Sequence, residues 1–237
     1  MNLQINKVAV LFSAGSDSSL AAAMAAECFR EVHLLTYKRL GIFKLGNIVS
    51  KVELLGKRYP DAVFNSQVLS IEEFFKDVSY EHYLSNLLKF GLRLVSVCGL
   101  CRLAMHWRTI IYCLEYNIKN VYDGASNRSR VFPEQNMEVM VKNISLLYAD
   151  FGIAYSAPVY YTKDAELELY NRGIIPVKRI RLTERDLQPV CIDNFLFSRF
   201  VYYYLGSHSW EKYVQGLAQF YAYKIDYVRK KIKASNP

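Results

Sequence analysis

The sequence predicts an α/β fold, an open parallel sheet with helices on both faces, followed by a helical C-terminal extension. Short apolar runs alternate along the chain with longer helical segments, which is the pattern of parallel strands joined by helical crossovers. The first run, 7–12, leads directly into a loop of small residues and an alanine-rich helical stretch over 18–29. Right-handed crossovers bring the carboxyl ends of such strands to one edge, where ligands bind.

Apolar periodicity and turn residues assign the other elements. A second strand (32–37) precedes a helix over 47–58, which ends before Tyr59-Pro60 because a residue that precedes proline is disfavoured in a helix. Further along, we expect a strand over 62–69, one or two helices over 71–92, a helix over 103–116, a strand over 120–123, a helix over 137–150, an extended segment over 153–159, a short helix over 162–171 and mostly helical structure over 195–233. We expect a nucleotide-binding core over 1–160 and a mostly helical region over 161–237.

Composition and charge narrow the class of protein. Of the 237 residues, 52% are hydrophobic and 22% are charged, which is the balance of a folded globular protein. No run approaches the ~18 apolar residues of a membrane helix, and the N-terminus lacks a signal-peptide pattern, so we expect a cytoplasmic protein without membrane partners. A net charge of +8 favours polyanionic ligands such as nucleotides or RNA. The charge excess near the C-terminus has two interpretations, a solvated helix face or a nucleic-acid contact surface. The basic residues concerned are Lys224, Arg229, Lys230, Lys231 and Lys233.

The loop after the first strand, Ser13-Ala14-Gly15-Ser16-Asp17-Ser18, has the chemistry of a phosphate site. Small residues let the backbone approach a phosphate, and Gly15 permits backbone angles that other residues avoid. A helix that begins near Ser18 directs its free N–H groups and its positive dipole end at the loop. Asp17 beside phosphate groups implies a Mg²⁺ ion between them. No lysine follows the glycine, so this is not a G-x-x-x-x-G-K-[ST] loop.

Residues 10–20, Val-Leu-Phe-Ser-Ala-Gly-Ser-Asp-Ser-Ser-Leu, resemble the signature of the PP-loop ATP pyrophosphatases, usually Ser-Gly-Gly-x-Asp-Ser. Ala14 stands where glycine is common. The resemblance implies the adenine nucleotide alpha-hydrolase (HUP-like) fold, ATP and Mg²⁺ as cofactors, and cleavage of ATP between its α- and β-phosphates with transfer of AMP to a substrate oxygen. It also implies that Ser13, Ala14, Gly15, Ser16, Asp17 and Ser18 bind the nucleotide, with Asp17 and Ser18 as catalytic residues.

A second loop, Asp123-Gly124-Ala125-Ser126-Asn127, follows a later apolar strand. It is similar to the second glycine-bearing loop of the same family, which implies that Gly124 and Asn127 shape the nucleotide pocket. The alternative is an ordinary Asp-Gly turn. Arg128 and Arg130 are placed to meet phosphate charge or to lie in a basic surface loop. Lys38 and Arg39, just past the second strand, have two interpretations, a place near the adenosine or a solvated position, and the sequence favours neither.

Cys98-Gly99-Leu100-Cys101 is compatible with a redox pair, half of a zinc site or part of an iron–sulfur site. Cys28 and Cys113 are expected to be buried as small apolar residues. His106 is expected to be packed in its helix rather than to bind metal.

A close cysteine pair with a distant third cysteine resembles the three-thiolate [4Fe–4S] site of a sulfur-transferring branch of the PP-loop family. That branch includes enzymes that 2-thiolate cytidine in tRNA and a sulfur transferase that makes a pyridinium cofactor. The resemblance implies that Cys98, Cys101 and Cys191 are cluster ligands. The alternative is three unrelated structural thiols.

Three functions stay open at this point. The first is adenylation of a carbonyl in tRNA, a nucleobase or a small-molecule acceptor, followed by sulfur transfer with a sulfur donor protein as partner. The second is an ATP-dependent amide ligase, and the third is a non-catalytic nucleotide- or RNA-binding module. Whether copies of the chain form a homo-oligomer is left open.

Overall fold

The computed structural model describes residues 6–40, 42–43, 48–91, 97–127, 138–175, 190–191, 203–204 and 206–235, with the backbone alone at 42–43 and 190–191. Its strands are β1 (Lys7–Leu11), β2 (Glu31–Lys38), β3 (Ile42–Phe43), β4 (Val63–Ser70), β5 (Asn120–Asp123), β6 (Ala154–Ser156) and β7 (Val190–Cys191). Its helices are α1 (Ser16–Cys28), α2 (Ile48–Arg58), α3 (Glu72–Tyr80), α4 (Tyr83–Phe90), α5 (Val97–Glu115), α7 (Glu138–Ala149), α8 (Ala165–Asn171) and α10 (Trp210–Ser235). No helix in these ranges is both long and apolar enough to cross a membrane.

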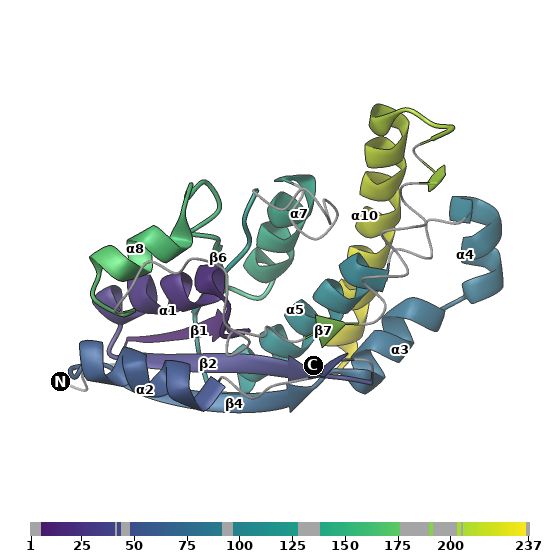
Figure 1. Ribbon diagram of the computed structural model, residues 1–237. Coiled ribbons are helices and arrows are strands. Elements are labelled where there is room, and N and C mark those ends of the chain that lie inside the picture. The colour runs from purple at the N-terminus through teal and green to yellow at the C-terminus, as the bar shows by residue number, and fades with distance from the viewer. Residues whose placement is uncertain are drawn as a thin grey trace.

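Five parallel strands form the main sheet in the order β4-β2-β1-β5-β6 (Figure 1). The central strand β1 pairs with β2 on one side and with β5 on the other, so that Leu11 lies beside both Leu35 and Asp123. The chain builds outward from β1 through β2 to β4 and then returns to the opposite side of β1 with β5. The carboxyl ends of β1 and β5 therefore flank a topological switch point, which is the usual ligand crevice of an open α/β sheet.

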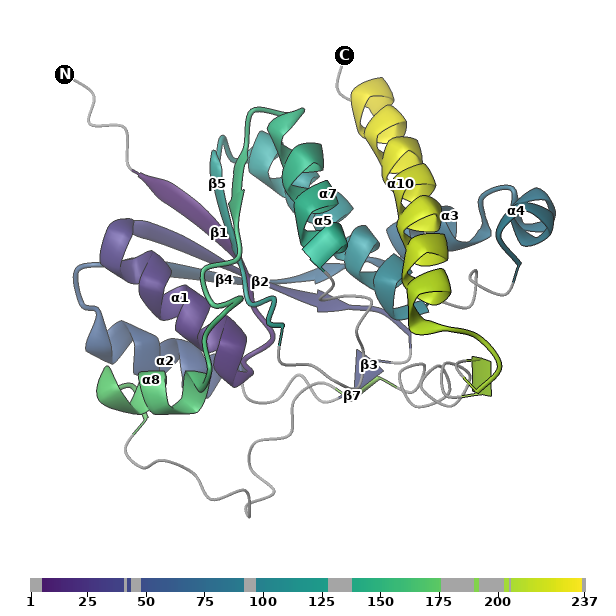
Figure 2. The ribbon, with the colours of Figure 1, turned by 90° about the horizontal axis from the view of Figure 1, so that it is seen from above.

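Helices cover both faces of the sheet, as predicted (Figure 2). Successive side chains of β1 alternate between two apolar clusters. Val8 and Val10 pack with residues of α1, α2 and α8, whereas Ala9 and Leu11 pack with residues of α5, α7 and α10. Burial on both faces explains why β1 reads as a continuous apolar run in the sequence.

The alanines of α1 let this helix pack closely between the sheet and α8. Ala21, Ala22, Ala23 and Ala25 are all fully buried. The helix begins at Ser16, two residues before the expected start, and ends at Cys28. Cys28 is exposed at this helix end, so the prediction that it is buried is wrong. Cys113 is buried as predicted, and burial raises the pKa of its thiol to about 12.

Helix α5 begins at Val97 rather than at the predicted residue 103. Its first turn contains Gly99, which disfavours a helix intrinsically. A β-carbon at position 99 would lie 1.7 Å from the Oη atom of Tyr221 in α10. Close packing of α10 on this turn overrides the low propensity of glycine. As a result, Cys98 and Cys101 lie within a helix rather than in a loop.

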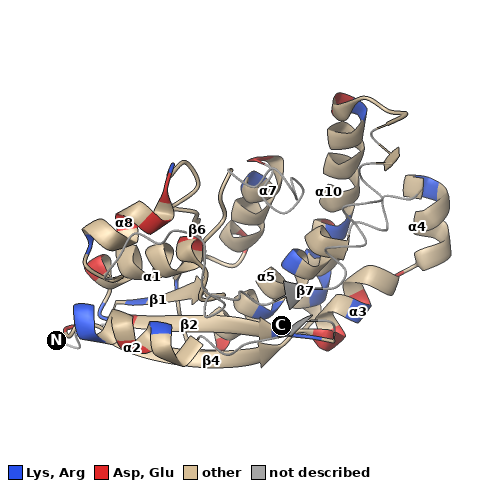
Figure 3. Cartoon of the chain, in the orientation of Figure 1, with Lys and Arg blue, Asp and Glu red and all other residues tan. Residues whose placement is uncertain are grey.

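The C-terminal extension contains α10, a helix of 26 residues that carries many of the basic residues near the C-terminus (Figure 3), and several of these have acidic partners. Lys224 is fully buried, and its Nζ atom lies 3.1 Å from Glu81 Oε2 in α3's exit turn. This excludes Lys224 as a phosphate contact, because binding an external phosphate requires an accessible ammonium group. Ion pairs also join Arg229 to Asp150, Lys230 to Asp226 and Lys231 to Asp77. The contacts favour the interpretation of α10 as a packed helix with a solvated face.

Candidate active site

The carboxyl end of β1 is anchored firmly before the predicted phosphate loop begins. The backbone N–H of Phe12 donates to the carbonyl of Leu35 at 2.8 Å, and the Thr36 hydroxyl donates to the carbonyl of Phe12 at 2.7 Å. Leu35 and Thr36, the two partners of Phe12, both belong to β2. The loop therefore leaves the sheet from a fixed point at the switch between β1 and β5.

Ser18 holds the loop closed from the first turn of α1. Its Oγ atom donates to the carbonyl of Gly15 at 3.1 Å and accepts from the backbone N–H of Ser13 at 3.2 Å. The hydroxyls of Ser13 and Ser18 are also 3.2 Å apart. Ser18 is buried while Ser13 is exposed, so the hydroxyl of Ser18 shapes the loop from within.

The left-handed backbone of the loop falls on Ala14, not on the glycine after it. Ala14 has φ 60°, whereas Gly15 has φ −75° and ψ 167°, angles that any residue adopts. The expectation that Gly15 supplies unusual backbone angles is therefore wrong. In this chain the positive φ falls on Ala14, which stands where the resembled signature commonly has glycine.

The first turn of α1 directs backbone amides at the loop. The first intrahelical bond runs from Ser19 N–H to the Gly15 carbonyl at 2.9 Å, so the backbone amides of Ser16, Asp17 and Ser18 lie in the first turn at the positive end of the helix dipole. Ser16 and Asp17 are partly exposed in this turn. An anion that entered the loop would meet these amides and the positive end of the helix dipole.

The second predicted loop packs directly on this turn. A β-carbon at Gly124 would lie 2.8 Å from Ser18 N and 2.9 Å from Ser18 Cα, so only glycine fits at this position. Further along the loop, the backbone N–H of Asn127 donates to the carbonyl of Tyr160 at 3.1 Å, and its side chain is exposed. The structure thus brings Gly124 against Ser18. Arg128 and Arg130 lie outside the described residues.

The cysteine pair is buried in the first turn of α5, three residues apart and hence on one helix face. Arg39, which follows β2 at the carboxyl edge, donates from Nε to the Sγ atom of Cys101 at 3.1 Å. The guanidinium also lies over the ring of Phe75, 4.3 Å from its centroid. The sequence does not predict this contact of Arg39 with the cysteine pair. Its position just past the end of a strand is the feature that could have indicated a place near the site. Lys38 beside it is exposed.

The backbone of Cys191 pairs with Ile42 in the short antiparallel β3–β7 ladder. Figures 1 and 2 place this ladder near the start of α5. The Cys191 side chain lies outside the described residues. Among the side chains that are described, no group of three or more His, Cys, Asp or Glu is arranged to hold a metal ion.

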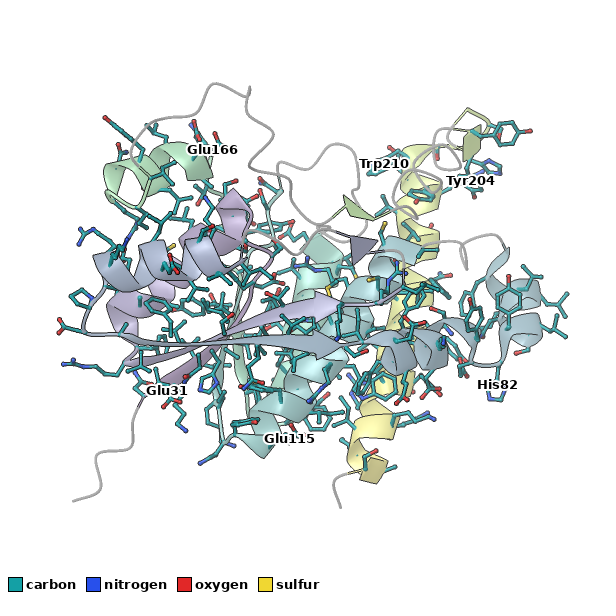
Figure 4. The ribbon with its side chains drawn as sticks, turned by 60° about the horizontal axis from the view of Figure 1, so that its bottom comes forward. Glu31, His82, Glu115, Glu166, Tyr204 and Trp210 are labelled. Atoms are coloured by element: carbon teal, nitrogen blue, oxygen red, sulfur yellow. The ribbon has the colours of Figure 1, made fainter. Side chains whose placement is uncertain are left out.

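Both loops and the cysteine pair lie toward the carboxyl edge of the sheet. Glu31, the first residue of β2, and Glu115, the last residue of α5, mark the opposite edge in Figure 4. His106, deeper along α5, is fully buried, and its Nδ1 atom lies 3.0 Å from the hydroxyl of Tyr148. His106 is thus packed within the protein, as the sequence predicts.

Comparisons with known proteins support the fold. No protein-family model matches the chain, and no curated protein sequence does. The chain is similar to the crystal structure of a predicted subunit of tRNA methyltransferase from Methanocaldococcus jannaschii, with 19% sequence identity and a TM-score of 0.41. The match covers 78% of this chain and 96% of that chain. A solved 4-thiouridine synthetase in complex with RNA and ATP is 13% identical, with a TM-score of 0.50. The match covers 95% of this chain and 53% of the synthetase, so the chain spans about half the length of that enzyme. This chain therefore has the α/β fold of the synthetase, the HUP-like fold expected from the loop after β1.

Proposed function

We propose that this protein binds ATP between its two loops, cleaves it to AMP and pyrophosphate, and thereby activates a carbonyl of tRNA for replacement of oxygen by sulfur. The observation that carries the proposal is the backbone contact between Gly124 and Ser18 at the switch point. It joins a phosphate-type loop and a glycine-bearing loop around one helix N-terminus, and both loops resemble those of the PP-loop family, with Ala14 in place of a common glycine.

Each site residue receives a role in this proposal. The loop Ser13-Ala14-Gly15-Ser16 and the amides of the first α1 turn hold the pyrophosphate part of ATP. Asp17 holds Mg²⁺, which neutralises charge that develops on the phosphates. Ser18 keeps the loop in its reactive shape, and Gly124 and Asn127 border the nucleotide. The nucleotide-binding core is proposed to extend over residues 1–160, with 161–237 as the helical region.

The chemistry proceeds in two displacements. The carbonyl oxygen of the acceptor attacks the α-phosphorus of ATP, and the bond to the β-phosphate breaks with release of pyrophosphate. A sulfur nucleophile then attacks the activated carbon, and AMP leaves with the former carbonyl oxygen. An adenylate is a much better leaving group than oxide, which is the reason for spending ATP.

Separate observations support the proposed acceptor and the proposed sulfur source. The synthetase that shares the fold was solved with RNA and ATP, and the net charge of +8 suits a polyanionic acceptor. Cys98 and Cys101 fit a thiolate ligand pair, because both are buried on one helix face and Arg39 donates to one of them. With Cys191 they would hold a [4Fe–4S] cluster, whose fourth iron supplies a binding place for sulfide delivered by a donor protein.

The test is pyrophosphate release from ATP by Asp17→Asn. We expect the rate to fall by about two orders of magnitude, the loss typical when one group that stabilises transition-state charge is removed. Asp61→Asn, at an exposed turn before β4, is the matched control and should retain the wild-type rate. Wild-type pyrophosphate release by Asp17→Asn would show that the site is misassigned.

A further inference from the structure

A buried carboxylate lies directly beneath the proposed nucleotide site. Asp123 is the last residue of β5, is 2% exposed and stands beside Leu11, two residues before Ser13. Gly124, the residue that packs on the first turn of α1, follows it immediately. A displacement of Asp123 would therefore also displace Gly124 and change its contact with Ser18.

Three side chains converge on one oxygen of this carboxylate. Arg102 pairs with Oδ2 through Nη2, Tyr155 donates its hydroxyl to Oδ2 at 2.7 Å, and His106 Nε2 faces Oδ2 at 3.5 Å without a hydrogen bond. Burial lowers the pKa of His106 to about 3, so this imidazole is uncharged at neutral pH. Burial disfavours the charged carboxylate, yet Arg102 and its other neighbours hold the pKa of Asp123 below its ordinary value. Arg102 is thus the cation that compensates Asp123.

Arg102 comes from the cysteine-bearing helix. It follows Cys101 in α5, and its side chain is 16% exposed. The guanidinium spans from this helix to the strand end, while Arg39 approaches Cys101 from β2. The cysteine turn and the second loop are consequently tied together through one charged hydrogen bond, which is directional as well as strong.

We propose that Arg102 is a positioning residue of the nucleotide site, which holds Asp123 and so keeps Gly124 against the first turn of α1. The inference rests on the proposed ATP site. Without Arg102, the carboxylate of Asp123 is buried without a countercharge and must move or take up a proton. Either change releases the end of β5 and opens the phosphate loop, although Arg102 itself touches no phosphate.

The experiment measures binding of an ATP analogue with a methylene group between the α- and β-phosphates, by calorimetry. We expect Arg102→Met to raise the Kd at least tenfold and to raise the KM for ATP in the pyrophosphate assay, while kcat stays within about threefold. Because this variant leaves an unpaired buried charge, a double variant, Arg102→Met/Asp123→Asn, removes both charges together. The double variant should regain stability toward urea but still bind the analogue at least tenfold more weakly than the wild type, since the tie to α5 is absent.

The controls separate positioning from stability. Lys224→Met/Glu81→Gln removes another buried ion pair, between α10 and the end of α3, and should leave the Kd unchanged. Wild-type affinity in the Arg102/Asp123 double variant would mean that the pair only stabilises the fold, and equal weakening in the Lys224/Glu81 control would mean the same. A wild-type protein that does not bind the analogue would instead refute the proposed function.

Discussion

Ala14 takes the left-handed backbone conformation that its neighbour Gly15 is free to adopt but does not. Ala14 has φ 60°, and Gly15 has φ −75°. The Cβ atom of a non-glycine residue in this conformation is too close to the backbone carbonyl oxygen, which costs roughly 1–2 kcal/mol. The loop thus keeps its shape at the expense of local strain, and the surrounding hydrogen bonds of Ser18 hold it there.

Ala14→Gly should stabilise the protein. Removing the Cβ relieves the strain, and the greater freedom of glycine in the unfolded chain offsets part of the gain, so we expect the free energy of unfolding to rise by about 1 kcal/mol. Urea unfolding followed by fluorescence measures this change. Asn117→Gly is the comparison, because Asn117 also has a positive φ of 52° but asparagine tolerates it better. If Asn117→Gly raised the free energy of unfolding as much as Ala14→Gly does, the strain would not be specific to Ala14.

Gly124→Ala should weaken ATP binding. Its β-carbon would meet backbone atoms of Ser18 at 2.8–2.9 Å, and neither strand nor helix can yield cheaply, so we expect at least a tenfold higher Kd for the α,β-methylene ATP analogue. Gly56→Ala provides the matched control. Gly56 lies in α2, and apart from its own helix no atom of the described residues lies within 4 Å of its β-carbon position. The change should stabilise the helix by about 1 kcal/mol and leave the Kd for the analogue unchanged. Unchanged binding by Gly124→Ala would remove the contact on which the proposed site rests.

The cysteine assignment predicts which thiols retain iron. After anaerobic purification, Cys98→Ala, Cys101→Ala and Cys191→Ala should each lose most of the iron and the visible absorbance, because a three-thiolate site has no spare ligand. Cys113→Ala, which alters a buried thiol, and Cys28→Ala, which alters an exposed one, should retain both. Iron that is absent from the wild type, or equal in all variants, would reject the cluster and favour the amide-ligase alternative.

Acid should destabilise the protein partly through His106. Its pKa is about 3 when folded and about 6.5 when unfolded, so the unfolded chain binds the extra proton between these values. The stabilisation is complete above pH 6.5 and is lost as the pH falls toward 3, with a slope approaching 1.4 kcal/mol per pH unit. His106→Phe keeps an aromatic ring and removes the titration. Urea unfolding between pH 4 and pH 8 should give a shallower slope for the variant below pH 6.5 and parallel curves above it.

His33 contributes to acid sensitivity with the same sign, because burial also lowers its pKa. The wild type and His106→Phe both contain His33, so their difference isolates position 106. Identical slopes in the two proteins would show that His106 is protonated in the folded state or reached by water.

The central strands and the strand–loop–helix course of residues 7–28 were predictable because their signals are local. Val8 and Val10 face one helical layer while Ala9 and Leu11 face the other, and burial on both faces produces an apolar run that the sequence displays directly. The loop after β1 combines small residues with a helix start over six positions, which also needs no distant contact. The strand order, and with it the switch point beside β1, is known from the structure alone.

Features that depend on distant contacts were not predictable in the same way. The β3–β7 ladder joins residues near 42 to residues near 190 through two positions each, too short for any periodicity. The early start of α5 depends on Tyr221 covering Gly99, and the pairing of Arg102 with Asp123 joins a helix to a strand end. The positive φ of Ala14 could not be predicted from the residue type, because alanine ordinarily avoids this backbone conformation.

The contact between Gly99 and Tyr221 has a consequence for the order in which the protein matures. The first turn of α5 is synthesised well before α10, the last described helix, which covers it. During translation all five strands of the main sheet are synthesised before α10, so the turn with Cys98 and Cys101 lacks its cover until this helix is made. A chain cut short before α10 would leave the turn with Cys98 and Cys101 open to solvent. It would also lack the part of the apolar cluster that α10 shares with β1 and β2, so the cover of the cysteine turn and the completion of the core depend on the same helix.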